Sequence, residues 1–167
     1  SDSFTYTATD NMGEISDTTI ANINITPVND APVTVDIDGN GNEGEIIYAI
    51  LSATDVDSNN PDNFSFTIIN QPIYKINSID LDTNTIEYNN GVFTQIVTYT
   101  HDGSETLSDN FTFRANDGTD DSNISTAIIT INPINDSPET IDISGNGNEG
   151  GIITTSLTAT DTDNDDP

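Results

Sequence analysis

The chain has 167 residues, of which 29 are acidic and only two are basic, so its formal net charge is −27 at pH 7. Nucleic acids and anionic membrane surfaces bind clustered Lys and Arg, so this charge excludes both as direct partners. The absence of cysteine excludes disulfides and thiol catalysis, and no apolar run approaches the roughly 18 residues that a membrane-spanning helix needs.

Low hydrophobicity with high net charge is also typical of disordered chains, so the type of apolar residue has to distinguish a folded chain from a disordered one. The chain contains 24 Ile and 25 Thr. These β-branched residues fit a pleated strand. The composition therefore favours a folded, all-β protein.

Three motifs occur twice, 106 residues apart. They are PVNDAP at 27–32 and PINDSP at 133–138, GNGNEG at 39–44 and 145–150, and ATDVD at 53–57 and ATDTD at 159–163. A period of about a hundred residues is the size of an independent sandwich domain. We therefore predict a tandem array. In it, residues 1–32 end one repeat, 33–138 form a complete repeat and 139–167 begin the next, within a longer parent protein.

Alternation of apolar and polar residues predicts short strands throughout, and no segment has a helical period. In chain order the predicted apolar faces are Phe4, Tyr6 and Ala8; Ala21, Ile23 and Ile25; Ile47, Ala49, Leu51 and Ala53; Phe64, Phe66 and Ile68; Phe111, Phe113 and Ala115; and Ala127, Ile129 and Ile131. Further strands are expected near 73–80, 85–88 and 92–100. Paired prolines at each join should end strand pairing, because proline donates no backbone hydrogen bond. The pattern predicts an immunoglobulin-like Greek-key β-sandwich.

Acidic and amide side chains cluster in the predicted loops. Asp55 and Asp57 lie where the chain leaves one predicted strand, and Asp161 and Asp163 do so in the second copy. Glu43 lies in a glycine-rich loop. For any single acid, a solubilising surface role is the alternative. Oxygen ligands in loops, with no thiol and a single histidine, suit a hard cation that takes six to eight oxygens. This favours calcium over magnesium or zinc.

These residues make the chain resemble the cadherin repeat, in the bacterial cadherin-like form found in large tandem-repeat adhesins. The stretch 111–138, from FTFRANDG to PINDSP, is similar to the last two strands and linker of such a repeat. The stretch YTHDGSE at 99–105, followed by SDNF, also resembles chondroitin-sulfate-proteoglycan repeats. The resemblance implies calcium bound between successive domains.

The resemblance also implies which residues hold the ion at each of two junctions. The second junction would use Glu43, Asp102, Glu105, Asn135, Asp136, Asp161 and Asp163. The first would use Asn29, Asp30, Asp55, Asp57 and Asp117, with its remaining ligands before Ser1. Pro27 and Pro133 replace the family's first linker aspartate. We therefore expect fewer ions per junction than in a cadherin.

Two other patterns point to competing sites. DIDGNG at 36–41 fits the first half of an EF-hand loop, but Ile47 stands where the loop requires glutamate, so a hairpin turn is the better interpretation. His101 is the single histidine and lies in a predicted turn, where a solvated or capping role is commoner than catalysis. We expect no enzymatic activity.

The sequence thus predicts an extracellular segment of a bacterial surface adhesin, whose partners are neighbouring repeats of the same chain and whose joins are stiffened by calcium. Two alternatives stay open. One is a filament whose copies pack laterally or exchange strands. The other is a carbohydrate-binding module that uses Tyr48, Tyr74 and Tyr88, although no tryptophan supports it.

Overall fold

A computed structural model describes residues 1–81 and 85–163 of the chain, which divide into two compact units. Residues 82–84, and 164–167 at the end of the predicted third repeat, lie outside the described residues. The first unit, Ser1–Asp30, contains an antiparallel pair of strands, β1 (Asp2–Tyr6) and β2 (Thr19–Ile23), with Phe4 opposite Ala21. Phe4 and Tyr6 are both about half exposed, and no residue of either strand is buried.

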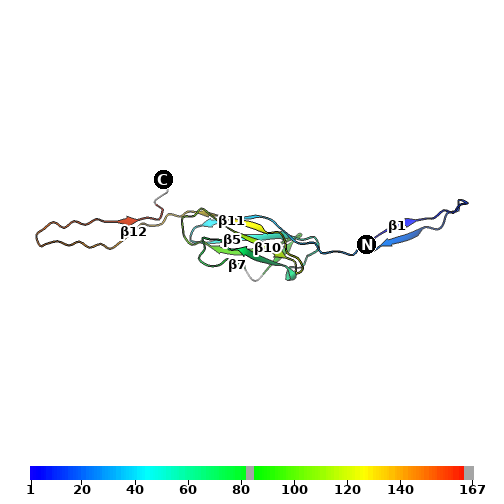
Figure 1. Ribbon diagram of the computed structural model, residues 1–167, viewed down its shortest axis with the longest axis horizontal. Helices are drawn as coiled ribbons and strands as arrows, with labels where there is room; N and C mark the ends of the chain where they lie inside the picture. The colour runs from blue at the N-terminus through cyan, green and yellow to red at the C-terminus, as the bar shows by residue number, and fades with distance from the viewer. Residues whose placement is uncertain (82–84, 164–167) are drawn as a thin grey trace. The chain divides into compact units, whose positions relative to one another are not determined.

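The second unit contains a sandwich of two sheets (Figure 1). One sheet has the strand order β4–β11–β10–β6, and the other has the order β3–β5–β9–β7, with β8 also paired to β9. The bounds are β3 (Val33–Thr34), β4 (Ile37–Asn42), β5 (Ile46–Thr54), the 3-10 helix η1 (Pro61–Asn63), β6 (Ser65–Asn70), β7 (Asp80–Leu81), β8 (Glu87–Asn89), β9 (Val92–Thr100), β10 (Ser108–Asn116) and β11 (Ser125–Asn132). The predicted all-β sandwich is confirmed. In the described residues, no helix is long and apolar enough to cross a membrane.

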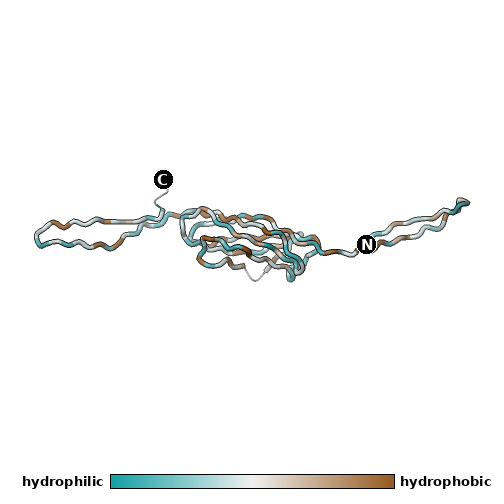
Figure 2. Tube along the Cα trace, in the orientation of Figure 1, coloured by the Kyte–Doolittle hydropathy of each residue, from teal (hydrophilic) through white to brown (hydrophobic). Residues whose placement is uncertain are grey.

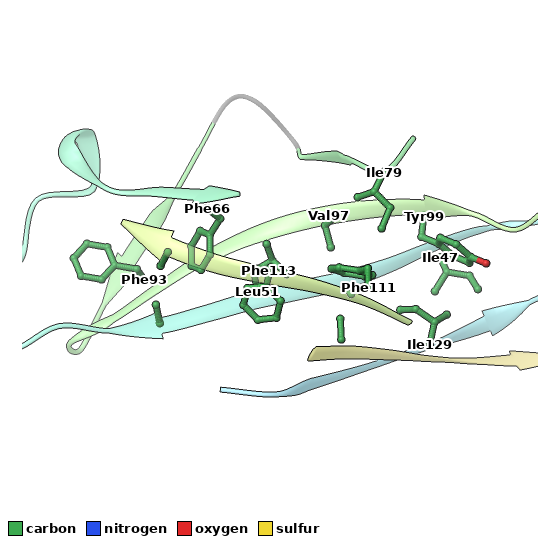
Figure 3. Packing of buried hydrophobic residues seen from close by; sticks show 14 of the residues in the cluster. Ile47, Leu51, Phe66, Ile79, Phe93, Val97, Tyr99, Phe111, Phe113 and Ile129 are labelled. Carbon is green, nitrogen blue, oxygen red and sulfur yellow. The ribbon is translucent and has the colours of Figure 1, made fainter. Parts of the chain in front are cut away.

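Figure 2 shows hydrophobic and hydrophilic positions interspersed along the strands of the sandwich. The core lies between the two sheets, and most of it comes from the predicted apolar faces, with Phe93, Val97, Tyr99 and Ile79 in addition (Figure 3). On β5 and β9 every second residue is buried, while the residues between them are exposed or half-buried. Phe64 stacks on Phe93 with ring centroids 3.9 Å apart and an interplanar angle of 2°. Burying each large apolar side chain contributes about 1.5–3 kcal/mol, so this one cluster is the main source of stability.

The prediction of a hairpin turn at residues 36–41 is wrong, because residues 37–42 form strand β4 instead. This strand pairs in parallel with β11, and the turn follows it at 43–45. Two glycines explain the difference. A Cβ on Gly41 would lie 2.5 Å from Ile47 Cγ1, and one on Gly39 would lie 2.9 Å from Ile129 Cδ1. The glycines therefore let β4 approach the core more closely than any other residue could.

The strand expected at 73–80 forms only in part, since Asp80–Leu81 pair with β9 as β7 and Lys75 makes a single antiparallel bridge with His101. The cause is the buried carboxylate of Asp109, which accepts hydrogen bonds from the backbone N–H groups of Ile73 (3.2 Å) and Tyr74 (2.7 Å). These groups are thus bound to a side chain rather than to a neighbouring strand. The hydroxyl of Tyr99 lies 3.1 Å from the same carboxylate. Burial and the charge of Asp109 both raise the pKa of Tyr99.

After the sandwich, residues 133–138 form a linker without strands, as the prolines predicted. The chain then forms a second, small antiparallel pair, β12 (Glu139–Thr140) with β13 (Ala159–Thr160). The residues between them are exposed. All buried hydrophobic residues among those described lie between Ile47 and Ile131.

The Asp109 network gives a test of the fold. Asp109→Asn replaces one acceptor oxygen with a donor, so buried N–H and hydroxyl groups lose their partner, and we expect the free energy of unfolding to fall by about 2–4 kcal/mol. The measurement is urea unfolding followed by circular dichroism. Asp38→Asn is the control, because Asp38 is exposed on β4 and its replacement removes the same charge. Equal stabilities of the two variants would contradict the role assigned to Asp109.

Candidate metal centre

The turn between β4 and β5 carries a buried glutamate. Glu43 is 7 % exposed, and its backbone N–H donates to the carbonyl oxygen of Asn132 (3.0 Å). Its Oε1 accepts a hydrogen bond of 2.6 Å from the backbone N–H of Ile134, in the linker. Its Oε2 is buried and has no hydrogen-bond partner. A buried carboxylate oxygen without a hydrogen-bond partner is unfavourable, so this atom is suited to bind a cation.

Two further carboxylates converge on Glu43. Glu105, in the turn between β9 and β10, and Asp163, just after β13, each place an oxygen so that the three ligand atoms lie within 4.8 Å of one another. Glu43 is buried, Asp163 half-buried and Glu105 exposed. Three carboxylates at this spacing repel one another unless a cation lies between them. The oxygen-only ligand set suits a hard cation such as calcium.

The electrostatics of Glu105 reflect this crowding. Loss of water contact and the negative charges of Glu43, Asp163 and Asp136 all raise its pKa, and a hydrogen bond with Asp163 adds to the effect. Asp102, three residues earlier in the same turn, behaves in the opposite way. Its side chain accepts a hydrogen bond from Ser104, which lowers its pKa.

The structure thus separates the ligands predicted for the second junction. Glu43, Glu105 and Asp163 come together, whereas the carboxylate of Asp102 is used within its own turn. Asp136 is tied to the cluster, because its N–H donates to Asp163 Oδ2 and its Oδ2 accepts from the Thr162 hydroxyl. Asp161 Oδ1 accepts from the N–H of Asp163 (3.1 Å), and the Asn135 side chain donates to the Asp136 carbonyl (2.8 Å).

The residues predicted for the first junction belong to different units. Asn29 and Asp30 lie in the first unit, where the Asn29 side-chain amide donates to the backbone carbonyl oxygen of Asp30 (3.3 Å). In the second unit, Asp55 Oδ1 accepts from the N–H groups of Asp57 (2.8 Å) and Ser58 (2.9 Å), while its Oδ2 is buried without a hydrogen-bond partner. Asp117 is buried, and its Oδ1 accepts from Thr119 and Asp120 N–H groups.

Sequence reasoning missed the environment of His101. The expected solvated role is wrong, because the side chain is fully buried. The capping alternative is closer, since Nδ1 accepts hydrogen bonds from the backbone N–H groups of Gly44 (3.3 Å) and Gly103 (3.2 Å). In the sequence, Gly44 follows Glu43 and Gly103 follows Asp102. These two glycines were the one signal available for the contacts of the imidazole.

The comparisons with known proteins agree with this architecture. Residues 37–131, more than half of the chain, match the model of the cadherin-like family. The chain belongs to the cadherin-like family. The matched region of this cadherin-like chain runs from β4 to β11 and includes Glu43 and Glu105.

A longer stretch resembles a curated protein. This cadherin-like chain is 31 % identical to the extracellular matrix organizing protein FRAS1 of Homo sapiens over 130 residues. The match covers 71 % of this chain and 3 % of FRAS1. An endo-fucoidan hydrolase of glycoside hydrolase family 107 matches at a TM-score of 0.46 and 14 % identity, covering 79 % of this chain and 19 % of that one. A variant of that hydrolase matches at 0.44 and 18 %, covering 79 % and 18 %. Scores this low carry no argument about activity.

The raised pKa of Glu105 gives a test in the absence of metal. A raised carboxyl pKa means that the stability from this group is present below its ordinary value of 4.5 and is lost as pH rises through the raised value. With EDTA at pH 7, we therefore expect Glu105→Gln to unfold at higher urea than the wild type. The difference should vanish near pH 4.

Glu87→Gln is the matched control, because it removes one negative charge from an exposed position on β8, outside the cluster. If both glutamine variants stabilise the protein equally at pH 7, net charge rather than crowding at Glu105 is responsible.

Proposed function

We propose that the chain is a non-enzymatic, extracellular segment of an adhesion or matrix protein, with calcium bound at the join between successive domains. Two observations on one side chain carry this proposal: Glu43 has a buried Oε2 without a hydrogen-bond partner, and it offers a carboxylate oxygen within 4.8 Å of oxygens of Glu105 and Asp163. The residues fit the ion. Glu43, Glu105 and Asp163 would hold it, and the ion would supply the positive charge that the cluster lacks.

The position of these ligands along the chain explains how an ion would stiffen the join. Glu43 and Glu105 belong to the sandwich, whereas Asp163 follows the linker at 133–138. An ion shared by the three ties the segments before and after the linker together. Without the ion, their mutual repulsion favours separation.

An extracellular location is supported by two considerations. The first is that the curated relative is described as an extracellular matrix organizing protein. The second is that the carboxylate cluster fits calcium, and a site with the Kd of about 10⁻⁴–10⁻³ M that is typical of extracellular modules would be filled only outside a cell. The bacterial origin expected from the sequence stays a prediction, as does assembly of copies into a filament.

The repeat boundaries are supported by matching strand registers. Val33 pairs with Thr54 in the sandwich, and Glu139 pairs with Thr160, 106 residues further along in each case. A Cβ on Gly147 would lie 2.5 Å from Ile153 Cγ1, which repeats the approach of Gly41 to Ile47. We infer that neighbouring repeats are the natural partners of this segment and that Asn29, Asp30, Asp55, Asp57 and Asp117 serve the preceding join.

Carbohydrate binding is less well supported. Tyr48 is 63 % exposed, but Tyr88 packs against Phe93 with ring centroids 4.7 Å apart, and Tyr74 is half-buried. A sugar ring would therefore find one open aromatic surface rather than three.

Calcium should stabilise the chain through the named ligands. At a hundredfold excess over Kd, calcium adds about 2.7 kcal/mol to the free energy of unfolding. We expect replacement of Asp161 and Asp163 by alanine to weaken calcium binding at least tenfold by calorimetry. Replacement of Asp62 and Glu87, two exposed acids outside the cluster, should leave binding within about twofold. An EDTA-independent melt of the wild type would refute the calcium hypothesis.

The contact between Glu43 and the linker gives a second test. Ile134→Pro removes the N–H that donates to Glu43 Oε1 without altering any carboxylate, so the linker loses its attachment beside the ion. We expect weaker calcium binding and, in a chain of three successive repeats, a smaller calcium-induced increase in the radius of gyration by solution scattering.

Ile134→Ala is the matched control, because it shortens the side chain and keeps the N–H. If the proline and alanine variants respond to calcium alike, the hydrogen bond from Ile134 to Glu43 does not contribute to the join.

A further inference from the structure

One imidazole joins the two turns that supply glutamates to the cluster. His101 follows β9 directly, and its backbone N–H donates to the carbonyl oxygen of Glu45 (3.2 Å). Its side chain is 0 % exposed. Nδ1 accepts from Gly44 N–H in the turn before β5 and from Gly103 N–H in the turn before β10. The ring therefore connects turns that are more than fifty residues apart in sequence.

The hydrogen bonds determine the state of the ring. A nitrogen that accepts from two N–H donors carries no proton of its own, so the proton of the neutral imidazole is on Nε2. Nε2 lies 2.9 Å from Thr106 Oγ1 and 3.8 Å from Asp102 Oδ1, both in the turn before β10. All polar atoms of the buried ring are thus used within the two turns.

The turns also touch through their backbones. Gly44 and Gly103 have φ angles of +65° and +81°, and a Cβ built on either would lie 4.0 Å from the Cα of the other. Glu43 immediately precedes Gly44, and Glu105 lies between Gly103 and Thr106. Both glutamates are therefore adjacent to atoms that the imidazole holds.

We propose that His101 is a positioning residue that fixes the separation of the Glu43 and Glu105 carboxylates, and through it the calcium affinity of the site. The inference rests on the proposed function, because it assumes that the cluster binds calcium. The carboxylates repel one another in the absence of the ion, and Glu105 is exposed to solvent. With the imidazole in place, the turns are held at the spacing the ion requires, so binding does not have to order them.

Two substitutions separate the functions of the two ring nitrogens. His101→Asn places an amide oxygen near the position of Nδ1 and can still accept from Gly44 and Gly103. His101→Gln reaches toward the position of Nε2 and keeps the contact with Thr106 while losing the acceptor at Nδ1. Thr106→Ala is the matched control, because it removes the hydroxyl beside Nε2, together with its contact to Ser104 Oγ, and leaves the acceptor at Nδ1 intact.

The measurements are calcium calorimetry on the full chain, at a temperature where each variant is folded in EDTA, and melting in EDTA. We expect His101→Asn and Thr106→Ala to bind within about threefold of the wild type and His101→Gln to bind at least tenfold more weakly. A melting change without a change in affinity would assign His101 a merely structural role and overturn the proposal. If the wild type binds calcium and His101→Gln binds it with the same affinity, the proposal is overturned too, but the proposed function stands. A wild type that binds no calcium would overturn both.

If His101→Gln fails to fold, nitrogen NMR of the wild-type imidazole still decides the matter. The proposal requires the proton on Nε2, an unprotonated Nδ1, and Gly44 and Gly103 amide resonances that shift on calcium addition. A proton on Nδ1, or amides that do not respond to calcium, would overturn it.

Discussion

A buried carboxylate with one satisfied oxygen is the constraint on which the rest of the site depends. Glu43 Oε1 accepts a hydrogen bond from the linker, whereas Oε2 is buried without a hydrogen-bond partner, and the carboxylate lies close to those of Glu105 and Asp163. A group buried in this way is unfavourable unless charge of the opposite sign joins it. In the proposed function, the same side chain would therefore link the attachment of the linker to the binding of a cation, which would otherwise be independent.

The backbone around Glu43 is arranged to tolerate this unfavourable group. The glycines of β4 bring the strand close to the core, and the turn that follows places Glu43 beside Asn132, where β11 ends. The burial of Glu43 thus derives from the hydrophobic core rather than from the acidic loops. The burial of the sixteen hydrophobic residues in the described core cluster offsets the unfavourable free energy of the unpartnered oxygen.

Period-two alternation was sufficient to predict the buried faces of β5, β10 and β11, because these strands have one face on the core and one on solvent. It failed for residues 36–41 and for most of 73–80. In the first segment the close approach of two glycines to the core determines the backbone pairing, and in the second the side chain of Asp109 does so. Glycines that serve a tight contact look the same in sequence as glycines that form a turn, and the hydrogen bonds of Asp109 to Ile73 and Tyr74 join residues 35 and more positions apart. The same limit applies to the site. Resemblance predicted Glu43, Glu105 and Asp163 among twelve candidates, but nothing in the spacing separated them from Asp102.

The parallel pairing of β4 with β11 has a mechanical consequence. The linker before the sandwich is followed by the two-residue strand β3 and then by β4, and the linker after it leaves from the end of β11. The ladder from Ile37 and Ala127 to Asn42 and Asn132 therefore lies between the two points where the chain would be pulled. Tension along the chain loads this ladder in shear. All of its hydrogen bonds then resist together, whereas an antiparallel pair pulled from one end would open one bond at a time. The domain is in this way suited to transmit force.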